Sequence, residues 1–102
     1  MAEIILIGAP GQTRPYAAAG LRCFEPGRGR LIERVLAERV RCEVLAMTRA
    51  AYGALPTALA RELQEQAWPA LAIVPAVRDA ADAARVAKRL FGMYAGSGPV
   101  AA

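Results

Sequence analysis

The spacing of hydrophobic positions changes several times along the chain, and each change predicts a new element. Residues 4–7 are four consecutive apolar side chains, which is typical of a strand that is buried on both faces of a parallel sheet. Further stretches rich in apolar residues at 21–24, 43–47 and 70–74 end at turn residues or at a threonine. The pattern therefore predicts four strands, the first of them over 3–7.

Between these strands, apolar residues recur three and four positions apart, which predicts helices. We expect four helices, over 14–19, 28–41, 49–66 and 79–92. Gly20 is expected to end the first helix as its C′ residue, whereas Thr48 and Asp79 are expected to cap the third and the last. Gly53 and Pro56 interrupt the third helix, so we expect a short piece before Pro56 and a longer one after it.

The helix expected over 28–41 has a marked amphipathic pattern. Charged side chains fill the positions between its apolar residues, and Arg34 and Glu38 are spaced as an i,i+4 ion pair on a solvated face. The apolar residues are expected to form one stripe that faces the core. This stripe comprises Leu31, Ile32, Val35, Leu36 and Val40.

Strands and helices alternate along the whole chain, which predicts an α/β domain with a parallel sheet and helices on both faces. We expect the strand order 2-1-3-4, as in Rossmann-like or receiver-like three-layer sandwiches, with the apolar first strand in the centre. The single domain is expected to span 1–94 and to include the helix at 79–92. A loose tail follows from Met93, and 95–102 are expected to be flexible.

The composition adds limits on location and class. The chain has 102 residues, of which 56% are hydrophobic, enough for one domain with its own core. No apolar run approaches the roughly 18 residues that span a bilayer, and no basic region precedes the first apolar stretch. We therefore expect a cytoplasmic protein without direct membrane insertion.

The net charge of +4 does not single out nucleic acid as a partner. Arginines in the expected helix at 28–41 alternate with Glu33 and Glu38, which is the pattern of a solvated helix face. Aromatic residues, which usually accompany basic residues in nucleic-acid interfaces, are not interleaved with them. We therefore expect no nucleic-acid binding.

The residue types that carry most catalytic and metal chemistry are scarce. The chain has no histidine, the commonest general base, and only two cysteines, Cys23 and Cys42. Their spacing is neither that of a zinc site nor that of a redox dithiol. We expect both to pack as small hydrophobic residues and expect no metal, no cofactor and no enzyme activity.

The stretch EIILIGAPGQT places two glycines directly after the first strand, where phosphates often bind in α/β proteins. The dinucleotide pattern is absent, and Pro10 between Gly8 and Gly11 has no N–H to offer an anion. The lysine of a phosphate-binding loop is also missing, since Lys88 is the only lysine. We interpret the stretch as a tight turn, with Thr13 as the N-cap of the next helix.

These elements resemble the F subunit of the V/A-type (vacuolar/archaeal-type) rotary ATPases. The resemblance lies in the stretches EIILIGAPGQTRPYAAAGLRCFEP, CEVLAMTRAAYGALPTALARELQEQAWPALAIVP and DAADAARVAKRLFGM. In that family the first strand typically ends in Gly, the short helix in Ala-Gly, the third strand in Thr and the fourth in Ile-Pro or Val-Pro. The corresponding residues here are Gly8, Ala19 and Gly20, Thr48, and Val74 and Pro75.

The resemblance implies a non-catalytic component of the central stalk, peripheral to the membrane. Such a component binds the coiled-coil shaft, which is the D subunit, and through it is linked to the A/B catalytic head and the membrane rotor. It helps to couple ATP hydrolysis or synthesis to the transport of H⁺ or Na⁺. The chain departs from the family at Ala9, where an Asp is common, and in the helix at 28–41, which is less acidic than in many relatives.

A receiver-like signalling or interaction domain is the alternative function. A receiver needs a phosphoacceptor Asp at the end of the third strand and a Lys after the fourth. This chain has Met47 or Thr48 and Pro75 at those positions, so phosphotransfer is not expected. A small enzyme would need a polar constellation at the carboxyl edge of the sheet, where Arg49 and Arg78 are interpreted as solvated.

The last helix is the expected site of partner binding. Its inner face is made of small residues, whereas bulky side chains cluster near its end beside two arginines. Exposed aromatic residues next to arginine are typical of interface anchors. The predicted partner-binding residues are Arg85, Arg89, Leu90, Phe91, Met93 and Tyr94.

Overall fold

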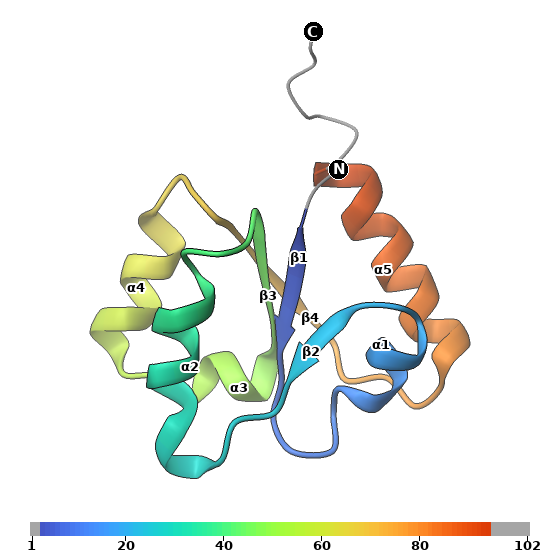
Figure 1. The fold of residues 1–102 in the computed structure, drawn as a ribbon, viewed down its shortest axis with the longest axis horizontal. Coiled ribbons are helices and arrows are strands. Elements are labelled where there is room, and N and C mark those ends of the chain that lie inside the picture. Colours follow the sequence, from blue (N-terminus) through green and yellow to red (C-terminus); the bar gives the residue numbers. More distant parts are fainter. Residues whose placement is uncertain (1–2, 95–102) are drawn as a thin grey trace, which may run out of the picture.

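The computed structural model of the chain describes residues 3–94, which form an α/β domain around a four-stranded sheet. The strand order is β2-β1-β3-β4 and every neighbouring pair is parallel, so the expected sheet is confirmed (Figure 1). The strands are β1 (Ile4–Ile7), β2 (Arg22–Phe24), β3 (Val44–Thr48) and β4 (Ala70–Val74). The tail expected at 95–102 lies outside the described residues.

The helices cover both faces of the sheet, as expected. Figure 1 shows α1 (Arg14–Ala18) and α5 (Ala80–Tyr94) on one side of the strands. The other side carries α2 (Leu31–Glu38), α3 (Arg49–Gly53) and α4 (Thr57–Glu65), with the 3₁₀ turn Arg28–Arg30 before α2.

Alternate residues of β1 enter two separate core clusters because successive strand side chains point to opposite faces. Ile4 and Leu6 pack toward α1 and α5, whereas Ile5 and Ile7 pack toward α2, α3 and α4. All four residues are at most 4% exposed. The unbroken apolar run of β1 is therefore explained by burial on both faces.

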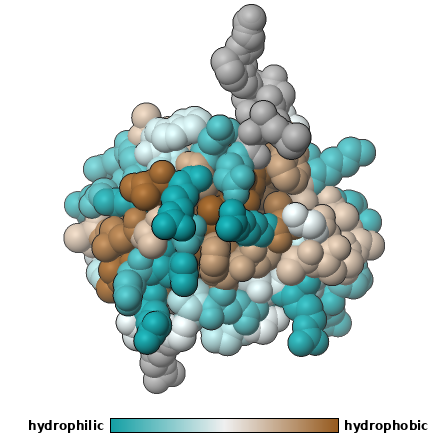
Figure 2. Space-filling model, in the orientation of Figure 1, coloured by the Kyte–Doolittle hydropathy of each residue, from teal (hydrophilic) through white to brown (hydrophobic). Residues whose placement is uncertain are grey.

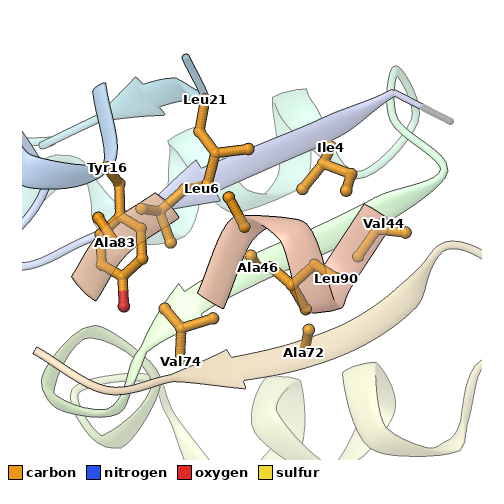
Figure 3. Packing of buried hydrophobic residues seen from close by; sticks show 11 residues of the cluster. Ile4, Leu6, Tyr16, Leu21, Val44, Ala46, Ala72, Val74, Ala83 and Leu90 are labelled. Atoms are coloured by element: carbon orange, nitrogen blue, oxygen red, sulfur yellow. The ribbon is translucent and has the colours of Figure 1, made fainter. Parts of the chain in front are cut away.

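The cluster under α1 and α5 is built around Tyr16, whose side chain is fully buried (Figure 3). Its hydroxyl donates a hydrogen bond to the carbonyl of Pro75 at 2.5 Å, which ties α1 to the end of β4. The alanines of α5 that face the sheet, Ala83 and Ala87, are small enough to let this helix lie close to it.

The helix expected over 28–41 is shorter than predicted, and three of its five stripe residues are turned away from the core. Only Leu31 and Val35 of the five stripe residues pack in the core. Ile32, Leu36 and Val40 are 44%, 43% and 78% exposed, so their predicted burial is wrong. In Figure 2, hydrophobic side chains show between hydrophilic ones over the part of the surface where α2 lies in Figure 1.

A charged pair takes the place of those apolar residues beside the core. Arg34 donates a hydrogen bond to Glu38 at 2.8 Å, which confirms the expected i,i+4 pair. Glu38 is 2% exposed, so it does not lie on a solvated face as predicted. The guanidinium of Arg34 lies 4.5 Å from the centroid of the Phe24 ring, and this contact fixes α2 against the end of β2.

The helix ends follow the local sequence with few exceptions. Gly20 has φ +100° directly after the C-cap of α1, as expected for a C′ glycine. Thr48 caps α3 by accepting from Ala51 N–H, and Asp79 accepts from Asp82 N–H at the start of α5. The last helix, expected to end at Gly92, continues to Tyr94.

Candidate partner-binding surface

The groove between β4 and α5 is the surface that contains three of the six predicted contact residues, Arg89, Leu90 and Met93. Figure 1 shows α5 running along one face of the sheet beside β4, the last strand in the sheet order. The groove encloses about 350 Å³. Its β4 wall is Leu71–Pro75, and its α5 wall comprises Val86, Arg89, Leu90 and Met93. We call this surface the β4–α5 groove.

The two walls of the groove follow from ordinary helix and strand geometry. Val86, Arg89 and Met93 are three or four residues apart, so they form one row along α5. Leu90 lies one step further toward the sheet and is 6% exposed. The Leu90 side chain is therefore part of the hydrophobic core, and little of it is exposed for a partner to contact.

The β4 wall is an open sheet edge. The inner edge of β4 pairs with β3 from Ala70 to Val74, and no described strand pairs with the outer edge. Ile73 projects from this strand with 40% exposure, and Trp68, just before it, is 65% exposed. An apolar, unpaired strand edge is a surface on which another chain can bind.

The predicted contact residues do not all lie together. Arg89 and Met93 border the groove. Arg85 is exposed and forms an ion pair with Asp82 one turn earlier on α5. Phe91 is 36% exposed and is not among the residues that line the groove.

Tyr94 is the last residue of α5, and its side chain lies outside the described part of the structure. Trp68 and Ile73 are the surface residues that the sequence prediction missed. The sequence contained a sign of their exposure. Trp68 stands next to Pro69 before the strand, and Ile73 belongs to the strand that the order 2-1-3-4 places at the edge of the sheet.

The carboxyl edge of the sheet, where α/β proteins usually bind ligands, is engaged in internal contacts. The backbone N–H groups of Gly11 and Thr13 donate to the carboxylate of Glu25 at 3.1 and 3.0 Å. The N–H of Ala9 donates to Thr48 Oγ1 at 3.2 Å. A side chain of the protein therefore occupies the donors that a phosphate would need.

Thr13 precedes α1 as expected, but its hydroxyl does not cap the helix. It donates instead to Glu25 Oε2. This hydrogen bond is the main reason that the pKa of Glu25 is lowered, and the two backbone donors add to the effect. The hydrogen bond from Thr13 to Glu25 thus stabilises the loop after β1 rather than the start of α1.

The described residues offer little for metal or nucleophilic chemistry. Within 3–94, no three residues of the types His, Cys, Asp and Glu are grouped so that they could hold a metal ion. Cys23 and Cys42 are free thiols, and burial raises the pKa of each to about 11. Thiols in this environment are poor nucleophiles at neutral pH.

Comparisons with known proteins do not place the chain in a family. No protein-family model, no curated protein and no solved structure matches the chain. Among the helices of residues 3–94, none combines the length and the apolar character that crossing a bilayer requires.

Proposed function

We propose that this chain is a non-catalytic interaction protein, equivalent to the F subunit in the central stalk of a V/A-type rotary ATPase. The proposal is supported by the resemblance at the strand ends, on Gly8, Gly20, Thr48 and Pro75, and by the order of the elements. Its partner is the coiled-coil shaft of that stalk. In this role the chain is cytoplasmic, and the shaft links it to the A/B head and the membrane rotor.

The observation that carries the proposal is the β4–α5 groove, because it suits a helical partner. Its walls are apolar, and Arg89 stands at its border. A helix of the shaft could place apolar side chains in the groove and a carboxylate against Arg89. Since α5 is fixed to the sheet by Ala83, Ala87 and Leu90, the surface that meets the shaft is rigid.

Coupling in this proposal is mechanical and needs no reacting group. A stalk protein turns with the shaft, so it must hold its partner without changing shape as torque passes. The parallel sheet, with helices on both faces, supplies that rigidity through two packed clusters. The ATP chemistry and the choice between H⁺ and Na⁺ then belong to other components of the complex.

A receiver-like interaction domain that lacks its phosphoacceptor is the alternative. Its strand order and carboxyl edge are compatible with this fold, but the third strand ends in Met47 and Thr48. The Thr48 hydroxyl accepts from the N–H groups of Ala9 and Ala51. Binding of the shaft protein distinguishes the two, because neither is expected to gain a phosphoryl group and only the stalk assignment requires that partner.

Co-purification with the coiled-coil shaft protein from the same organism tests the proposal directly. Tagged wild-type chain is expected to retain the shaft protein through gel filtration. The variants Arg89→Glu and Met93→Asp are expected to weaken binding at least about tenfold, because Arg89→Glu repels a partner carboxylate and Met93→Asp places a charge among the apolar residues of the groove. Val40→Asp is the matched control, since Val40 is 78% exposed on the opposite face.

Each outcome has a defined meaning once circular dichroism shows that the variants are folded. Failure of the wild-type chain to bind the shaft protein contradicts the assignment to the rotary stalk. Binding that survives both groove variants but is lost in Val40→Asp would place the contact at the turn after α2. Loss in the groove variants alone supports the proposal.

A further inference from the structure

A separate hollow lies at the carboxyl edge of the sheet and encloses about 250 Å³. It is bounded by the loop after β1, the turn after β2, the start of α2, and α3. The residues around it include Gly8, Pro10, Gly27, Leu31, Ala50 and Ala54. Every residue that lines it is glycine, alanine, proline or leucine, so a bulky apolar group can enter without meeting a polar side chain.

The position of the hollow follows from the strand order. The chain passes from β1 through α1 to β2 on one side, whereas β3 lies on the other side of β1. The loops after β1 and β3 therefore leave the sheet in opposite directions and open a crevice between them. Two small residues, Ala50 on α3 and Ala54 directly after it, keep that hollow from being filled.

The chemistry of the hollow disfavours a nucleotide or another phosphate ligand. The N–H of Ala9 is bound to Thr48, and those of Gly11 and Thr13 are bound to Glu25. An anion inside the hollow would find no free donor from these three residues and would lose its hydration. An aliphatic or aromatic side chain would instead exchange water for apolar contact.

The surroundings of the hollow are basic. Arg30 and Arg49 are exposed and adjoin the lining residues Leu31 and Ala50 in the sequence. Neither forms an ion pair with another residue of 3–94. Arg49 also lines a neighbouring hollow of about 390 Å³, which shares Ala50 with the first. Two unpaired guanidinium groups favour a partner with carboxylates.

An unsatisfied acceptor lies in the same neighbouring hollow. Gln12 lines it together with Arg49, and the Gln12 Oε1 atom is buried without a hydrogen-bond donor among the described residues. A buried polar atom without a partner is costly, and a bound peptide N–H could satisfy it. The apolar hollow, the arginines and this acceptor together match one kind of occupant.

We propose that the carboxyl-edge hollow binds an acidic segment of a protein partner that inserts one bulky apolar side chain. The side chain fills the space beside Ala50 and Ala54, and a flanking carboxylate pairs with Arg49. A backbone N–H of the segment donates to Gln12. The carboxyl-edge hollow shares no lining residue with the β4–α5 groove, and the neighbouring hollow shares only Pro75 with it. This proposal does not depend on the stalk assignment.

A peptide titration followed by NMR tests the proposal on the full chain. The probe is the pentapeptide acetyl-Glu-Glu-Phe-Glu-Glu-amide, and the readout is the amide shifts of Gly27, Ala50 and Ala54. The expected result is a saturable shift of these amides. Replacement of Phe by Ala in the peptide is expected to weaken binding about tenfold or more, as expected for loss of an anchor.

Variants of the chain locate the binding. Ala54→Leu fills the hollow and Arg49→Glu reverses the charge, and each is expected to weaken binding about tenfold. Ala58→Leu is the matched control, because Ala58 is an exposed helical alanine that does not line the hollow. Should Ala54→Leu fail to fold, Ala50→Leu fills the same space from another exposed position.

Three results would overturn the proposal: the absence of saturable shifts at the hollow, equal affinity for the Phe and Ala peptides, or unchanged affinity in Ala54→Leu. Arg89→Glu separates this test from that of the stalk assignment. It changes only the β4–α5 groove, so peptide binding is expected to stay at the wild-type level.

Discussion

Thr13 and Glu25 are joined by two hydrogen bonds that fasten the loop after β1 to the end of β2. The Thr13 N–H and hydroxyl both donate to Glu25 Oε2, the N–H at 3.0 Å. A third donor, the N–H of Gly11, reaches Glu25 Oε1. The carboxylate thus holds in place a loop that would otherwise present free N–H groups to anions.

This contact predicts a specific acid sensitivity. The pKa of Glu25 is lowered in the folded chain, chiefly by the Thr13 hydroxyl, so its ionised form stabilises the fold. That contribution is fully present above the unfolded pKa of about 4.3 and is lost as pH falls through the lower folded pKa. Urea unfolding at several pH values measures it.

Glu25→Gln is expected to lower the free energy of unfolding by about 1 kcal/mol at neutral pH, since the carboxylate is exposed and water screens it. As pH falls through the lowered folded pKa of Glu25, the variant and the wild type should converge. Glu65→Gln is the control, because Glu65 is also exposed and its side chain forms no hydrogen bond or ion pair with another residue of 3–94. Equal pH profiles for wild type and Glu25→Gln would contradict the prediction.

Gly8 is required by close packing. A Cβ at this position would lie 2.5 Å from Thr13 Cγ2 and 3.2 Å from Thr48 Cγ2. Gly8→Ala is therefore expected to destabilise the chain by about 1–3 kcal/mol, as overpacking does. Thermal and urea unfolding measure the change.

Gly53→Ala is the matched control for that substitution. Gly53 lies on α3, and a Cβ there would meet nothing within 4 Å. Stability is expected to stay the same or to rise by about 0.5 kcal/mol, because alanine favours the helix. A similar loss of stability in both variants would show that the packing at Gly8 is not the cause.

Val35 and Val40 provide a matched test of the orientation of α2. Val35 is fully buried and Val40 is 78% exposed. Val35→Ala should cost about 2 kcal/mol because it leaves a cavity, whereas Val40→Ala should change stability by less than about 0.5 kcal/mol. Equal costs in urea unfolding would favour the orientation that the sequence pattern predicted.

The two thiols are expected to react slowly in the native chain. Burial, with smaller effects from nearby carboxylates, raises the pKa of both Cys23 and Cys42 to about 11. Compared with an unperturbed thiol, the thiolate fraction at pH 7 falls about a hundredfold. A disulfide-exchange reagent should modify Cys23 slowly and the buried Cys42 more slowly still.

The matched measurement for the thiols is the same reaction in denaturant, where both should react at the rate of an ordinary cysteine. Raising the pH from 7 toward 10 should speed the native reaction by increasing the thiolate fraction. Rapid modification of either thiol in the native chain at pH 7 would contradict the prediction.

Local patterns in the sequence predicted the elements, their order and most helix ends. The run Ile4–Ile7 indicated a central strand because only a strand covered on both faces needs four apolar residues in succession. Gly20, Thr48 and Asp79 marked helix ends because capping depends on residues close in sequence. The same apolar run placed the first strand in the centre of the predicted order, and alternation of strands and helices predicted helices on both faces.

Only the tertiary structure decided how α2 is oriented, what Glu25 binds and which surfaces stay open. A periodic stripe gives the apolar side of a helix, but packing decides its final rotation, and here Arg34 and Glu38 lie beside the core while Leu36 is exposed. The bonds from Glu25 to the loop after β1 span twelve or more residues in sequence, so no local pattern signals them. The groove and the hollow likewise arise where separate elements meet, because an enclosed space belongs to no single segment of the chain.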